Sequence, residues 1–231
     1  MIKKENIKDG LVEKFYDDGQ LLLREGYENG KLNGLQEYYH GNGQLRDRTN
    51  YKDGQRDGLR ELFYDNGQLK TSLNYKNGEK EGHWEFFYEN GHLERRGNVK
   101  NGKDDGLWES YYENGQLSSV FHFKKGKYHG LKEIYFKNGQ LEFREDYKND
   151  KRDGLYEKFY ENGQLKVRGN YKAKLFQKSQ FHGLLEGFHE NGQLSSRGSY
   201  KNGKKHGLHE YFDEDGKLRA KENWKAGKRV E

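Results

Sequence analysis

One pattern returns nine times along this chain, and its regular spacing limits what the chain can fold into. Each unit opens at a glycine, and successive opening glycines are 24 residues apart except for one step of 29. The opening glycines are Gly10, Gly34, Gly58, Gly82, Gly106, Gly130, Gly154, Gly183 and Gly207. Self-similarity of this kind is typical of repeat proteins, in which each unit packs on its neighbours. We expect a single array over residues 10–231, preceded by a lead-in at residues 1–9.

Four residue types recur at fixed distances from the opening glycine. In the unit that opens at Gly154 they are Glu157, the aromatic Phe159, a second glycine at Gly163 and Leu165. The same four types occupy these positions in all nine units. This regularity indicates that the side chains of every unit pack in the same way.

The composition favours a thin sheet. Charged residues make up 35% of the 231 residues and apolar residues 30%, but 18 Tyr, 13 Phe and three Trp favour strands over disorder. No proline interrupts the chain, which suits a sheet that needs its backbone amides as hydrogen-bond donors. We predict an all-β fold, an elongated single-layer antiparallel meander of nine β-hairpin repeats with roughly 24 residues each.

Two turn sequences alternate along the array. Within units, Asn-Gly pairs such as Asn66-Gly67 separate two strand-like runs, and between units similar pairs recur, such as Asn77-Gly78. Asn-Gly between such runs predicts a two-residue type I′ hairpin turn. The inner turn then places Glu157 opposite Arg168, and the same arithmetic leaves only Glu61 (opposite Ser72) and Glu109 (opposite Val120) without a cationic partner.

A different inner turn would change the pairing. A three-residue loop with a bulged glycine shifts it by one residue and gathers Phe159 and Leu165 on one face. We favour the two-residue loop. It predicts one face with Leu155, Glu157 and Phe159, and another with Tyr160, Leu165, Val167 and Tyr171.

Two irregularities interrupt the pattern. Asp150 stands where the period requires a glycine, so the turn at Asn149-Asp150 is expected to differ in geometry. Five extra residues lie between Gly154 and Gly183, and they bring Phe176 and Phe181 into the segment 173–182. This insertion is either a tolerated loop or an anchor for a partner.

The sequence offers no convincing catalytic or metal site. The chain has no cysteine, and its glutamates recur as a structural ladder would. His206 and His209 lie three residues apart but without a helix to bring them together, so we predict no metal site and no cofactor. We expect a protein that is not an enzyme.

Two sets of residues are candidates for binding. The first set consists of tyrosines and insertion aromatics that could contact a protein partner, because aromatic residues are enriched at interfaces: Tyr16, Tyr64, Tyr88, Tyr112, Tyr160, Phe176 and Phe181. The second is a basic row that could bind acidic lipids, although each arginine has a predicted glutamate neighbour: Arg24, Arg48, Arg96, Arg144, Arg168 and Arg197.

The residues Tyr51-Lys52-Asp53-Gly54 through Gly58-Leu59, and the run GLWESYYENGQL from Gly106 to Leu117, resemble the MORN repeat in its bacterial variant form. The resemblance covers nearly the whole chain. The Glu-x-aromatic pattern after the opening glycine and the insertion before Gly183 depart from the eukaryotic type. The resemblance implies an elongated antiparallel sheet that scaffolds proteins or lies near membranes. It also implies a possible role as the antitoxin of a toxin-antitoxin pair.

These observations favour an interaction protein. The leading hypothesis is a repeat scaffold that binds a protein partner, such as a cognate toxin, and the alternative is a peripheral binder of acidic membrane lipids. The net charge of +5 is small and mixed in sign, so nucleic acid is not an expected partner. No apolar leader or membrane-spanning stretch is evident, so we expect a cytoplasmic location. The open sheet edges could mediate oligomerisation.

Overall fold

The computed structural model describes residues 9–174 and 178–230, and its regular structure there consists of strands alone. The chain divides into two compact units, Met1–Gly115 and Gln116–Glu231. Most of the predicted lead-in, residues 1–8, and residues 175–177 with Phe176 lie outside the described residues.

The first unit holds the strands of the first four repeats and the first strand of the fifth. They are β1 (Gly10–Phe15), β2 (Leu21–Glu28), β3 (Lys31–Tyr39), β4 (Leu45–Lys52), β5 (Gln55–Phe63), β6 (Leu69–Lys76), β7 (Glu79–Phe87), β8 (Leu93–Lys100) and β9 (Lys103–Tyr111).

The second unit continues the same alternation. Its described strands are β10 (Leu117–Lys124), β11 (Lys127–Tyr135), β12 (Leu141–Lys148), β13 (Lys151–Phe159), β14 (Leu165–Lys172), β15 (Gln180–Phe181), β16 (Gly183–Phe188), β17 (Leu194–Lys201), β18 (Lys204–Phe212), β19 (Leu218–Lys225) and β20 (Lys228–Val230).

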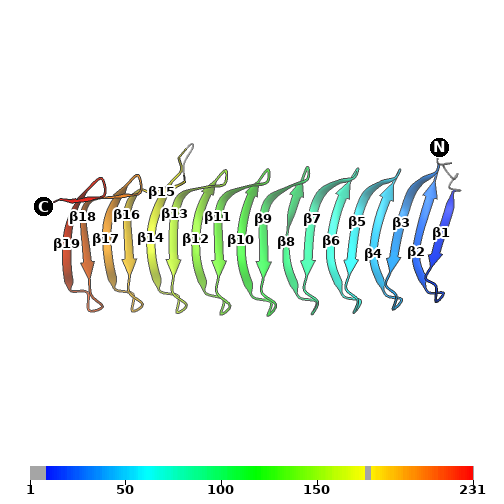
Figure 1. Cartoon of the computed structure of the whole chain (residues 1–231), viewed down its shortest axis with the longest axis horizontal. Coiled ribbons are helices and arrows are strands. Elements are labelled where there is room, and N and C mark those ends of the chain that lie inside the picture. The colour runs from blue at the N-terminus through cyan, green and yellow to red at the C-terminus, as the bar shows by residue number, and fades with distance from the viewer. Residues whose placement is uncertain (1–8, 175–177, 231) are drawn as a thin grey trace. The chain divides into compact units, whose positions relative to one another are not determined.

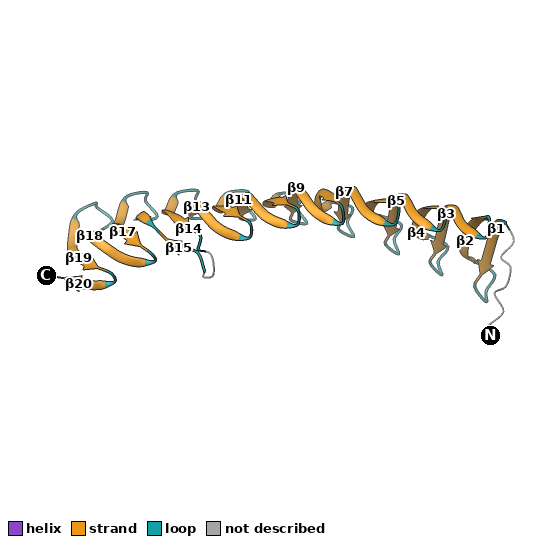
Figure 2. Cartoon of the chain, turned by 90° about the horizontal axis from the view of Figure 1, so that it is seen from above, coloured by secondary structure: helices purple, strands orange, loops and turns teal. Residues whose placement is uncertain are grey.

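Within each unit, strands that follow one another in the chain pair antiparallel, as in β3 with β4 and β17 with β18 (Figure 1). Each unit is a single layer of strands when seen from above (Figure 2). The predicted all-β antiparallel meander is therefore confirmed. The insertion splits one expected strand into β15 and β16, and both of these pair with β14.

The opening glycine recurs because the backbone needs it. All nine opening glycines have positive φ, for example 85° at Gly34 and 127° at Gly154. At Gly34 the register with β2 jumps, since Leu32 pairs with Tyr27 but Gln36 pairs with Glu25. A bulge with positive φ strains any residue with a side chain, so glycine is required here.

The two turn types differ, which corrects the prediction of type I′ turns within repeats. Asn77 and Gly78, between repeats, both have positive φ, 49° and 81°, and Lys76 pairs with Glu79 as in a two-residue type I′ turn. Within repeats the loop has three residues: the Tyr64 amide donates to the Gln68 carbonyl at 2.8 Å, and the Gly67 amide donates to the Tyr64 carbonyl at 2.9 Å. Among the residues of that loop only Gly67, at 83°, has positive φ. This is a type I turn with a bulged glycine.

The asparagine of the inner turn serves a different purpose from the one predicted. Asn66 Oδ1 accepts the Gln68 amide at 2.9 Å, and its Nδ2 donates to the Glu89 carbonyl of the next repeat at 3.1 Å. The side chain therefore fixes the loop and joins it to its neighbour, and the residue has no need of a left-handed backbone.

The register in the body of each hairpin is the predicted one. Glu157 pairs with Arg168, and equivalent pairs form in the other hairpins that lie within one unit, with Ser72 opposite Glu61. Near the inner turn the rival pairing holds, because Phe159 pairs with Leu165 while Lys158 pairs with Val167. The extra residue at Lys166 reconciles the two registers. Leu165 consequently shares a face with Phe159, so its predicted placement beside Val167 was wrong.

The turn at Asn149-Asp150 does not differ from its counterparts, contrary to the prediction. Both residues have positive φ, 50° and 65°, and Lys148 pairs with Lys151 across the same two-residue turn. Asp150 Oδ1 accepts the Tyr128 amide at 2.9 Å. Aspartate tolerates this backbone better than most residues, and here its side chain also finds a partner.

Side chains on one face pack large against small. This aromatic face carries Trp84 and Trp108, which are 7% and 2% exposed, on either side of Gly97 in the strand pairing. In the second unit Gly198 lies between Leu185 and His209 in the same way. Because glycine has no side chain, the ring of the residue paired with it on the neighbouring strand can lie over its backbone. The opposite face, which carries the glutamates and arginines, is called the ladder face.

Candidate interaction surfaces

Glutamate and arginine alternate from strand to strand on the ladder face. In the second unit the pairing joins Glu133, Arg144, Glu157, Arg168, Glu186, Arg197 and Glu210 in succession. Hydrogen bonds from Arg197 and then Lys221 lower the pKa of Glu210 below its ordinary value. A ladder of alternating charge holds the strands in register and leaves little net field.

The arginines predicted to bind lipid are all engaged in this ladder. Arg24 and Arg48 pair with the glutamate of their own repeat, at 2.9 Å from Glu13 and 3.1 Å from Glu37. The other four pair with the glutamate of the following repeat, at 2.6 to 2.8 Å: Arg96 with Glu109, Arg144 with Glu157, Arg168 with Glu186, and Arg197 with Glu210. The arginine row is thus neutralised within the sheet.

The tyrosines predicted to contact a partner stand just before the inner turns and are half-buried. Their hydroxyls reach the next repeat: Tyr64 donates to the Phe87 carbonyl at 2.8 Å, and Tyr160 donates to the Phe188 carbonyl at 3.0 Å. Tyr16 and Tyr88 make the same bond, at 2.8 Å, to Tyr39 and Tyr111, and Tyr112 is also half-buried. The hydroxyls of Tyr16, Tyr64, Tyr88 and Tyr160 are therefore engaged within the sheet.

The described part of the insertion packs inward. Phe181 stacks on Tyr171 with ring centroids 4.2 Å apart and lies 5.8 Å from Tyr156 and 6.2 Å from Tyr200. It therefore continues the aromatic face across the irregular repeat. Phe176, its predicted companion, lies outside the described residues.

A row of exposed leucines follows the opening glycines on the ladder face. In the first unit Leu11, Leu35 and Leu107 are 66%, 47% and 41% exposed. In the second unit Leu184 and Leu208 are 48% and 45% exposed. The sequence shows this leucine in eight of nine repeats, but periodicity alone does not separate a packed position from an exposed one.

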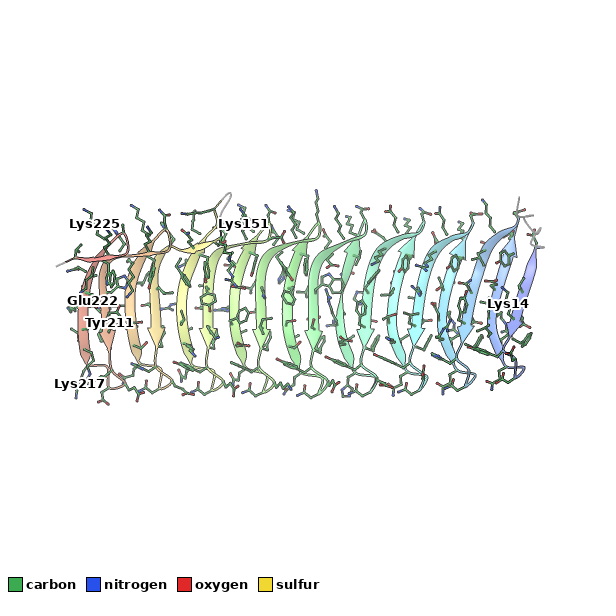
Figure 3. The ribbon with its side chains drawn as sticks, in the orientation of Figure 1. Lys14, Lys151, Tyr211, Lys217, Glu222 and Lys225 are labelled. Carbon is green, nitrogen blue, oxygen red and sulfur yellow. The ribbon has the colours of Figure 1, made fainter. Side chains whose placement is uncertain are left out.

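The turns on the two sides of the sheet differ in charge, which sequence reasoning missed. In the second unit the turns between repeats carry lysines, and Lys151 and Lys225 lie on this side while Lys217 lies on the other (Figure 3). The inner turns carry carboxylates instead, such as Glu161 and Glu190. The sequence contains this signal, since Lys-Asn-Gly occurs in three of the turns between repeats and Glu-Asn-Gly in four of the inner turns. We call the first side the lysine edge.

The most buried ionisable group lies on the aromatic face. Glu145 is 0% exposed, and its Oε1 lies 3.7 Å from Lys132 Nζ and accepts the Tyr147 hydroxyl at 2.9 Å. Arg152 Nε approaches Oε2 to 2.7 Å without the alignment of a hydrogen bond. Two cations thus compensate one buried carboxylate, which is a structural arrangement.

The histidines considered for a metal site lie in different surroundings. His209 is 4% exposed on the aromatic face, with Nε2 2.9 Å from the Ser199 carbonyl, whereas His206 lines a pocket on the lysine edge. Residues 9–174 and 178–230 contain no group of three metal-ligating side chains. Over the same ranges no helix is long and apolar enough to cross a membrane.

Comparison with known proteins assigns the repeats. A family model described as MORN repeat variant matches nine segments, residues 8–29, 32–53, 56–77, 80–101, 104–125, 128–149, 152–173, 181–202 and 205–226. No curated protein matches the chain.

Likeness to solved structures is weak. Two of them are described as "Crystal Structure of TcdB2-TccC3-TEV" and "Crystal Structure of TcdB2-TccC3-Cdc42", with identities of 10% and 9% and TM-scores of 0.26 and 0.25. The alignments cover 94% and 100% of this chain but only 16% of each of those chains. Likeness at this level assigns neither fold nor function.

Proposed function

Since the chain belongs to the MORN repeat variant family, we propose that it works as a non-enzymatic scaffold that binds a protein partner through its ladder face. The observation that carries the proposal is the row of exposed leucines beside the ion ladder. Where exposed leucines stand in successive repeats, as Leu11 and Leu35 or Leu184 and Leu208 do, they present a partner with contacts roughly 10 Å apart, the width of two strands.

The ladder beside the leucines suits this role. Its charges are paired within the sheet, so a partner that covers it need not supply a counter-charge for each arginine. Apolar contacts surrounded by polar, neutralised groups are the usual anatomy of a protein interface. The tyrosines predicted to bind, such as Tyr64, are half-buried and would contribute only the exposed part of each ring.

The experiment compares how much of a specific protein partner the unchanged protein and its variants capture from a lysate of the native cell. We expect Leu184→Ser with Leu208→Ser to reduce recovery of a specific partner at least about tenfold, since each leucine is an apolar contact. Leu218→Ser is the control for the row itself, because this leucine is also exposed on the ladder face, at 46%, but lies beside an inner turn outside the row. Equal recovery with all three proteins, each folded by circular dichroism, would count against the proposal.

The finer form of the proposal is that the partner is a toxin in a bacterial cytoplasm, which the chain neutralises by covering it. The support is the family resemblance together with the exposed leucines of the ladder face. Expression of the neighbouring gene with and without this chain tests it directly. Toxicity that this chain leaves unchanged would remove the antitoxin role but not the scaffold role.

A further inference from the structure

The lysine edge of the second unit places like charges directly opposite each other. Lys201 pairs with Lys204, and Lys225 pairs with Lys228, across their two-residue turns. Like charges directly opposite in a sheet are destabilising. In the first unit two turns hold opposite charges at this position, Glu28 with Lys31 and Lys76 with Glu79, whereas Lys100 pairs with Lys103. The repeat can therefore neutralise this position, but the turns at Lys201 and Lys225 do not.

Three of these lysines, Lys201, Lys204 and Lys225, line an open pocket of about 600 Å³. Its wall includes Lys174, Lys201, Lys204, Lys225, His206 and Gln180, and no carboxylate takes part in the lining. None of the ion pairs formed by residues 9–174 and 178–230 includes any of these four lysines. A cavity of this size is in the range of small-molecule sites.

The irregular repeat builds part of this wall. The insertion follows β14, and it brings Lys174 and Gln180 to the turns of the two repeats that come after it. Gln180 packs over Gly203, and the stem of Lys204 packs over Gly227. Lys201, Lys204 and Lys225 are exposed and Lys174 is half-buried, so four lysines of three successive repeats line one open space.

We propose that this lysine pocket binds a soluble organic anion that carries two or more phosphate groups. Lysine ammonium groups bind phosphate as point charges, and each phosphate carries up to two negative charges near neutral pH. Lys201 and Lys225 belong to successive repeats, which stand roughly 10 Å apart. One small ion cannot contact both, whereas phosphates spaced along one carbon skeleton can. The proposal does not depend on the leucine row, because none of those leucines lines the pocket.

The test is calorimetric titration of the full chain with inositol hexakisphosphate and with inorganic phosphate. We expect saturable binding of one inositol hexakisphosphate at about 0.15 M salt, and far weaker binding of inorganic phosphate. Lys201→Gln with Lys204→Gln should weaken binding at least about tenfold. The matched control is Lys124→Gln with Lys127→Gln, the same opposed pair in a turn that does not line this pocket, and it should change binding less than about twofold.

Two results would overturn the proposal. The first is an equal loss of affinity in both double variants, which would indicate general attraction to a basic edge. The second is an absence of binding to the soluble anion together with binding to acidic lipid vesicles or to nucleic acid. Both double variants replace exposed polar residues, and unchanged circular dichroism will separate loss of binding from loss of fold.

Discussion

Arg96 makes its ion pair with Glu109 of the following repeat, Nε to Oε2 at 2.6 Å, although Glu85 of its own hairpin stands directly opposite. Glu85 lies 3.3 Å from His83 instead. The ladder therefore joins one repeat to the next here, as well as closing the hairpin.

A double-mutant cycle tests this direction of pairing. We expect a coupling of about 0.5 kcal/mol between Arg96→Ala and Glu109→Ala, because the pair is partly exposed and screened by solvent. The cycle with Glu85→Ala should give a coupling near zero. Urea unfolding of the single and double variants supplies the free energies, and a larger coupling to Glu85 would contradict the structure.

The packing of Gly97 against Trp108 predicts a steric effect. A Cβ at Gly97 would lie 2.1 Å from Trp108 Cδ2, so Gly97→Ala should lower the free energy of unfolding by about 1 to 3 kcal/mol. Gly41→Ala is the control, since a Cβ there meets nothing within 4 Å and the φ is not positive. Combined with Trp108→Ala, the Gly97 substitution should cost less than it does alone.

The two kinds of Asn-Gly turn predict unequal responses to the same substitution. Asn77→Gly keeps a residue suited to positive φ, so stability should change by less than about 0.5 kcal/mol. Asn66→Gly removes the hydrogen bonds to Gln68 and Glu89 and should destabilise by about 1 to 2 kcal/mol. Thermal unfolding of the two variants measures both changes in stability. Equal destabilisation by Asn77→Gly and Asn66→Gly would mean that the two turns have the same geometry.

Tyr135 predicts how stability changes in alkali. Burial, followed by the hydrogen bond to Glu133, raises the pKa of Tyr135 to about 12 from the ordinary 10.0. The folded state therefore favours the neutral phenol, and this contribution is complete below about pH 10 and lost as the pH rises through about 12. Stability should fall less between pH 8 and pH 11 in Tyr135→Phe than in the unchanged protein. Urea unfolding at both pH values measures this, and an equal fall would be contrary evidence.

The hairpin repeat could be predicted from the sequence because its determinants are local. Alternating aromatic residues, the recurrent turn pairs and the spacing of Glu157 from Arg168 together define the strands and the main register. The inner turn could not be predicted from Asn66-Gly67 alone, since the same dipeptide at Asn77-Gly78 adopts a different turn. What decides is the hydrogen bond from the Gln68 amide to the asparagine side chain, together with a carbonyl supplied by the next repeat.

The candidate surfaces could be predicted less well, for a related reason. Exposure depends on how strands bend and which neighbours cover a side chain, so the tyrosines that precede the inner turns, such as Tyr64, and the exposed leucines, such as Leu184, could not be ranked from their periodicity. The lysine pocket needs Lys174, Lys201 and Lys225 from three repeats. They line one pocket because Lys174 and Gln180 of the irregular repeat lie beside the two turns that follow, which no local pattern encodes.

The bonds from Tyr64 to Phe87 and from Asn66 to Glu89 each reach one repeat ahead and no further. An interior module therefore meets the same two neighbours wherever it stands in the series. Duplication or loss of one 24-residue stretch in the gene would preserve every such contact. Evolution can in this way lengthen or shorten the sheet by whole repeats without designing a new core.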